Sequence, residues 1–174
     1  MIVTSTILIA LCALPFILIY GSTKQKEKQL KTGLLKAITK NNGTLSDCDT
    51  NADFAIGLDR NANQIYFYTK TSETDYTKTV NLNELDVCEV KKATKRIKNG
   101  NSNSELIENI TLVFTSANGT VIDEFEIYDY DKSSQISTEI TLADTWKKKV
   151  NELLLKNTKI IEVKKDKKID LSFA

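Results

Sequence analysis

The stretch at residues 106–127, LIENITLVFTSANGTVIDEFEI, carries the clearest structural pattern in the chain. Apolar and polar residues alternate on both sides of a short polar segment, as in two strands that each bury one face. That segment contains Asn118-Gly119, and Asn-Gly is the strongest short-range signal for a tight β-hairpin. The stretch therefore predicts two antiparallel strands joined by a tight turn.

Four further strands are expected ahead of this hairpin. Alternating patterns, or short apolar runs bounded by turn residues, predict them at residues 53–58, 64–69, 78–82 and 86–95. No connection before Ser134 is long and apolar enough to form a crossover helix. Parallel strands need such a crossover, so all six strands are expected to run antiparallel.

The last large element is predicted to be an amphipathic helix at residues 136–155. Its apolar residues recur at intervals of three and four, which is typical of a helix that buries one stripe. Trp146 lies in the middle of this stripe, so we expect it to be the central contact between the helix and the sheet. The apolar positions are Ile136, Ile140, Ala143, Trp146, Val150, Leu153 and Leu154.

This order of elements resembles that of bacterial pleckstrin-homology-like (PH-like) domain proteins with an N-terminal membrane anchor. The resemblance spans residues 52–155 and rests on FAIGLD at 54–59, YFY at 66–68, LNEL at 82–85 and the helical pair Ala143 and Trp146. It implies an α+β fold, in which an antiparallel PH-like sheet or barrel of six to seven strands is closed by a C-terminal amphipathic helix. It also implies a binding module and transfers no catalytic residue.

The N-terminal segment predicts a membrane anchor. Residues 2–20 contain no charged side chain, and as a helix they would extend roughly 28 Å, close to the ~30 Å hydrocarbon core of a bilayer. Residues 24–40 then carry six lysines against the single acid Glu27. Basic flanks stay on the cytoplasmic side, which predicts a single-pass protein of the cell membrane with its domain in the cytoplasm. An outward-facing domain remains the alternative.

The predicted organisation therefore has four parts. They are a transmembrane anchor at residues 1–21, a juxtamembrane helix at 22–42, a PH-like β domain with its C-terminal helix at 43–157, and a basic tail at 158–174.

The composition argues against an enzyme. The chain has no histidine, so neither a Ser-His-Asp nor a Cys-His arrangement can be built. Outside the anchor only Cys48 and Cys88 remain, too few for a zinc site, and whether they pair is left open. The carboxylate pairs Asp123/Glu126 and Asp129/Asp131 are interpreted as solvated strand edges. No catalytic residue, metal or cofactor is expected.

A second acidic pattern resembles the start of a calcium loop. It comprises Asp47, Asp49 and Asn51. A calcium loop needs Gly at its sixth position and Glu at its twelfth, where this chain has Ala52 and Leu58. The pattern is therefore interpreted as a polar turn leading into a strand.

Two groups of basic residues are the candidate binding residues. Those on the fourth strand and in the tail could contact an anionic surface, although lysines on an edge strand also serve to prevent aggregation. The formal net charge of +1 indicates no nucleic-acid partner. The candidates are Lys91, Lys92, Lys95, Arg96, Lys164, Lys165, Lys167 and Lys168.

The sequence thus favours a membrane-tethered, non-enzymatic binding or scaffolding module that presents a PH-like surface to a protein partner or to anionic lipid. The alternative is a pilin-like structural subunit of a surface appendage, because such subunits also join an apolar helix to an antiparallel sheet. The oligomeric state is left open.

Overall fold

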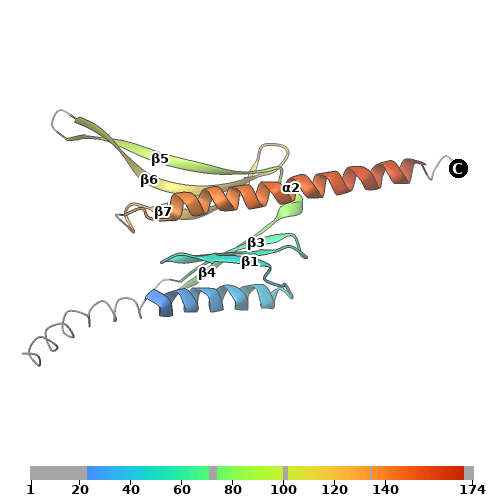
Figure 1. The fold of residues 1–174 in the computed structure, drawn as a ribbon, viewed down its shortest axis with the longest axis horizontal. Coiled ribbons are helices and arrows are strands. Elements are labelled where there is room, and N and C mark those ends of the chain that lie inside the picture. Colours follow the sequence, from blue (N-terminus) through green and yellow to red (C-terminus); the bar gives the residue numbers. More distant parts are fainter. Residues whose placement is uncertain (1–22, 71–73, 100–101, 134, 171–174) are drawn as a thin grey trace, which may run out of the picture. The chain divides into compact units, whose positions relative to one another are not determined.

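A computed structural model describes residues 23–70, 74–99, 102–133 and 135–170 (Figure 1). The chain divides into two compact units, and the division falls between Thr79 and Val80. Within the described residues, each unit combines one α-helix with one β-sheet.

The first unit begins with a helix at residues 23–40, here called the N-terminal helix. A four-stranded sheet follows, in which the order in space is the order in the chain, β1-β2-β3-β4. Pairing is antiparallel between β1 and β2 and between β2 and β3. The strands are β1 (Asp47–Thr50), β2 (Phe54–Asp59), β3 (Gln64–Lys70) and β4 (Asp75–Asn81).

One stripe of the N-terminal helix packs on this sheet. Leu30, Leu34 and Ile38 recur every fourth residue and are buried in a cluster with Ala55, Tyr66 and Tyr68. This close packing requires a strand residue without a side chain. A Cβ atom at Gly57 would lie 2.8 Å from Leu34 Cδ2 and 2.9 Å from Leu45 Cδ1.

The end of the N-terminal helix is tied to the β2–β3 turn by Asp59. This side chain is 1 % exposed, and its carboxylate accepts the N–H groups of Thr44 at 2.6 Å, Asn61 at 2.9 Å and Ala62 at 2.9 Å. The helix itself ends at Lys40, and Asn42 in the turn that follows has a positive φ of 56°, the left-handed conformation common after a helix.

The second unit contains a three-stranded antiparallel sheet in the order β5-β6-β7. The predicted hairpin at residues 106–127 is confirmed as β6, β7 and their turn, with Gly119 at a φ of 81°. Helix α2 packs on all three strands and on η1 (Figure 1). The elements are η1 (Leu82–Glu84), β5 (Val87–Asn99), β6 (Ser102–Thr115), β7 (Val121–Asp129) and α2 (Glu139–Asp170).

The core of the second unit forms under the stripe of α2. Ala143, Trp146 and Val150 are fully buried, as the helical pattern predicted, and so are Phe114 and Phe125 of the sheet. The two phenylalanine rings meet edge to face, with their centroids 4.6 Å apart. Such an arrangement is favoured by the charge distribution of aromatic rings.

The predicted PH-like sheet or barrel is wrong. The strands form two open sheets of four and three strands, and neither sheet closes on itself. The physical reason is that each sheet buries one face under a helix of its own unit. The N-terminal helix, which had been assigned a juxtamembrane role, covers the first sheet, and α2 covers the second.

The membrane predictions also need correction. The anchor expected at residues 1–21 lies outside the described residues. Within the described ranges, no helix is both long and apolar enough to cross a membrane. The expected single-pass location in the cell membrane, with a cytoplasmic domain, is contradicted by this finding.

Helix α2 is longer than the sequence pattern indicated. It continues through Asn157, where the pattern had suggested an end, and runs to Asp170. Residues 139–170 contain neither Gly nor Pro, so no helix-breaking residue interrupts it. Most of the expected basic tail, residues 158–170, is therefore helical.

Candidate functional site

The basic residues of β5 do not form a single patch. Successive side chains of a strand point to opposite faces, so Lys91 and Lys95 lie on one face while Lys92 and Arg96 lie on the other. All four residues are exposed. The candidate surface is consequently two-sided.

Two of these residues are paired with acids of the neighbouring strand. Lys95 Nζ lies 3.4 Å from Glu108 Oε1, and Arg96 Nε lies 3.7 Å from Glu105 Oε1. Exposed ion pairs of this kind contribute about 0–1 kcal/mol to stability. Lys91 and Lys92 form no ion pair with any residue that the structure describes, so their charges remain available to a partner.

The β5–β6 hairpin extends well beyond β7 (Figure 1). Strand β7 pairs with β6 only over residues 109–115, whereas β5 and β6 stay paired as far as Asn99 and Ser102. We call the two-stranded extension, residues 94–99 and 102–107, the β5–β6 arm. Its residues 94–97 are all exposed, and they include Ile97 with an exposed fraction of 39 %.

The four basic residues predicted in the tail lie on the last turns of α2. Lys164, Lys165, Lys167 and Lys168 have a helical backbone, and their side chains lie outside the described part of the structure. They therefore add no observed geometry to the candidate site.

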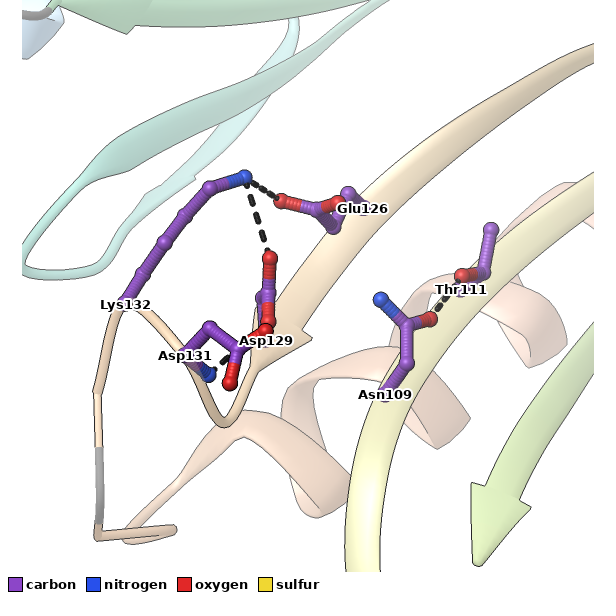
Figure 2. Close-up of polar contacts among 6 residues, drawn as sticks. All are labelled: Asn109, Thr111, Glu126, Asp129, Asp131 and Lys132. Carbon is purple, nitrogen blue, oxygen red and sulfur yellow. Dashed lines mark hydrogen bonds and ion pairs between the residues drawn. The ribbon is translucent and has the colours of Figure 1, made fainter.

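A lysine brings together carboxylates from the two pairs that the sequence had indicated (Figure 2). Lys132 Nζ contacts Glu126 Oε1 and lies 3.3 Å from Asp129 Oδ2, so the residues brought together come from different predicted pairs. Hydrogen bonding to Glu126 raises the pKa of Lys132, which stabilises its charged form. Two carboxylates that share one ammonium group are better suited to holding the turn after β7 in place than to acid–base catalysis.

The Cys88 side chain does not resemble a catalytic thiol. Neither Cys48 nor Cys88 forms a disulfide. Burial raises the pKa of the Cys88 thiol to about 12, and a protonated thiol is a poor nucleophile.

Asp47 and Asp49 belong to strand β1, paired with β2, and not to a calcium loop. Over the residues that the structure describes, no group of three or more Cys, Asp or Glu is placed to hold a metal ion.

A groove that the sequence did not reveal lies in the first unit. It has a volume of about 410 Å³ and runs between the N-terminal helix and the facing ends of β3 and β4. The helix contributes Lys28, Gln29 and Lys36 among other polar residues, and the strands contribute Tyr68, Lys70 and Asp75. The one sequence signal for it was Gly33, because a glycine inside a helix costs about 1 kcal/mol and needs a packing reason.

That packing reason is the ring of Tyr68, which lies directly on the helix backbone. A Cβ atom at Gly33 would lie 2.1 Å from Tyr68 Cζ, so only glycine leaves space for the ring. The Tyr68 hydroxyl donates a hydrogen bond to Asp75; burial, and then this bond, raise the pKa of Tyr68 to about 12. The hydroxyl therefore stays protonated at neutral pH and fixes the strand side of the groove.

Comparison of the chain with protein-family models, with curated proteins and with solved structures finds no match.

Proposed function

We propose that this protein is a non-enzymatic binding module that docks an acidic protein partner through the β5–β6 arm and the lysines at its base. The observation that carries the proposal is the extension of β5 and β6 beyond β7. An isolated pair of strands is marginally stable in water, and its two edges offer unpaired backbone groups. A partner strand or loop that paired with the arm would stabilise it and would form hydrogen bonds with its unpaired backbone groups.

The charge at the base of the arm defines the chemistry of the partner. Lys91 and Lys92 are exposed and form no ion pair with a described residue, so acidic groups on a partner would meet unneutralised charge. Charge complementarity of this kind speeds association and selects the partner. The exposed Ile97 supplies an apolar contact within the same arm.

A protein fits this surface better than a lipid bilayer does. The basic side chains alternate between the two faces of β5, and a flat anionic surface can contact only one face at a time. A protein segment that pairs along the strand edge reaches side chains on both faces, as in recognition by strand addition.

The non-enzymatic part of the proposal rests on chemistry already described. The chain has no histidine, the Cys88 thiol is protonated at neutral pH, and Glu126 and Asp129 both form ion pairs with Lys132. These groups offer neither an activated nucleophile nor a paired acid and base.

Site-specific photo-crosslinking of the full chain tests the proposal. Benzoylphenylalanine replaces Ile97 in the arm or, as a control, Leu155 of α2, which is 64 % exposed. We expect a protein adduct from position 97 that disappears in the Lys91→Glu/Lys92→Glu variant. The same adduct should persist in Lys147→Glu/Lys148→Glu, which reverses two exposed charges on α2.

Three outcomes would overturn the proposal. They are the absence of any adduct from position 97, equal adducts from positions 97 and 155, and an adduct that survives reversal of Lys91 and Lys92. If no protein is captured but the chain floats with anionic vesicles in a manner that depends on these two lysines, the partner is a lipid surface.

A further inference from the structure

The groove in the first unit carries positive charge that the fold does not use. Lys28, Lys36 and Lys70 line it, and none of them forms an ion pair with any residue in the described ranges. Asp75 is the one acidic side chain in the lining, and it already accepts a hydrogen bond from Tyr68. The groove therefore has an excess of two positive charges.

The spacing of the lysines indicates the shape of the ligand. Lys28 and Lys36 are eight residues apart on one helix, which corresponds to roughly 12 Å along its axis. Such a separation does not converge on a compact anion. An extended chain advances roughly 3.3 Å per residue, so carboxylates at positions i and i+4 are about 13 Å apart and point the same way.

The polar residues between the lysines suit a peptide backbone. Gln29 lies on the same lining between Lys28 and Lys36, and its amide can both donate and accept hydrogen bonds. The opposite wall is held in place by the contact between Gly33 and Tyr68. A groove with a fixed wall costs less free energy to occupy, because fewer groups need to be ordered on binding.

We propose that this groove binds an extended acidic peptide segment, with Lys28 and Lys36 pairing with carboxylates on one side of the segment and Lys70 contacting it from the strand side. This site involves none of the residues of the β5–β6 arm and does not depend on the function proposed for the arm. It defines a second interaction surface of a different shape.

Fluorescence anisotropy of the full chain with a labelled peptide of alternating Glu and Ser tests this assignment. The Lys28→Gln/Lys36→Gln/Lys70→Gln variant is expected to bind about five- to tenfold more weakly, since each exposed pair contributes a few tenths of a kcal/mol. The matched control is Lys26→Gln/Lys31→Gln/Lys40→Gln, which also removes three positive charges but takes them from positions of the N-terminal helix outside the groove lining. It should bind within about twofold of the parent chain, because its charges lie outside the lining.

A change of opposite sign sharpens the test. Asp75→Asn removes the acid of the lining while its side-chain oxygen still accepts the Tyr68 hydrogen bond, so tighter peptide binding is expected. Equal weakening in the two triple variants would show that only overall charge matters, and unchanged binding in Asp75→Asn would place the peptide elsewhere. The proposal also fails if the Glu–Ser peptide does not bind the parent chain, or if oligothymidylate binds more tightly.

Discussion

At the scale of single residues, Asp59 shows how a polar side chain joins two loops. The strand predicted at residues 53–58 stopped one residue before Asp59, which is the last residue of β2. The role of Asp59 depends on the backbone of Thr44, which is fifteen positions away. Burial raises the pKa of its carboxyl, yet the hydrogen bonds from Ala62, Thr44 and Asn61 outweigh this effect and leave the pKa below its ordinary value of 3.8. The folded state therefore stabilises the ionised form of the Asp59 carboxyl group.

The sign of the pH dependence follows from the lowered pKa of Asp59. Its contribution to the free energy of unfolding is fully present above pH 3.8, the ordinary value, and is lost as the pH falls through the lower value of the folded state. Asp59→Asn should lower the free energy of unfolding at neutral pH by about 1–3 kcal/mol and make it less sensitive to acid below pH 3.8. Urea titrations at neutral and acid pH measure both effects.

Asp53→Asn, at an exposed position before β2, is the matched control and should leave stability within about 0.5 kcal/mol of the parent chain. An Asp59→Asn variant that was equally stable at neutral pH would show that the Asp59 hydrogen bonds do not hold the two loops together.

At the scale of elements, the features that depend on residues close together in the chain were predicted correctly. The hairpin of β6 and β7 was predicted from its turn residues, and the apolar stripe of α2 was predicted from its periodicity. The β5–β6 arm was missed, because most of its residues are polar and the pairing of two strands uses only the backbone. The contact between Asn151 of α2 and the backbone of β5 could not be predicted from the sequence either. The Asn151 side chain accepts the N–H of Cys88 at 2.9 Å and donates to the carbonyl of Cys88 at 2.8 Å, so it caps the edge of β5.

Trp146 gives the prediction that belongs to α2. Its side chain is fully buried, and its Nε1 has no hydrogen-bond partner within the described structure. Trp146→Ala should lower the free energy of unfolding by about 3–5 kcal/mol through the cavity it creates. Trp146→Phe should cost less, because it keeps most of the apolar volume and removes the unpaired N–H.

Chemical denaturation followed by circular dichroism compares these variants with Leu155→Ala, whose exposed side chain should contribute less than about 0.5 kcal/mol. If Trp146→Ala changed stability as little as Leu155→Ala, the stripe of α2 would not be the main contact of this core.

At the scale of the whole chain, the pairing of the strands into sheets was not predicted correctly from the sequence patterns. The number and order of elements suggested one sheet with one closing helix, and the groove and the division into two units were not expected. Strand patterns specify which face is buried, but they do not specify which strands pair. That choice depended on details such as Gly57 and Gly33, which let the N-terminal helix approach the first sheet closely.

The division at Thr79 and Val80 leads to a prediction about cooperativity. The first unit has a core around Leu34 and Tyr66, and the second has a core around Trp146. Segments with separate cores open as separate cooperative units. In the full chain, Asp59→Asn should therefore accelerate amide hydrogen exchange in β2 and β3 while leaving exchange in β6, β7 and α2 unchanged. Trp146→Ala should accelerate exchange in β6, β7 and α2 while leaving exchange in β2 and β3 unchanged. Exchange measured by mass spectrometry decides between the two possibilities, because equal acceleration throughout would mean that the two cores unfold as one.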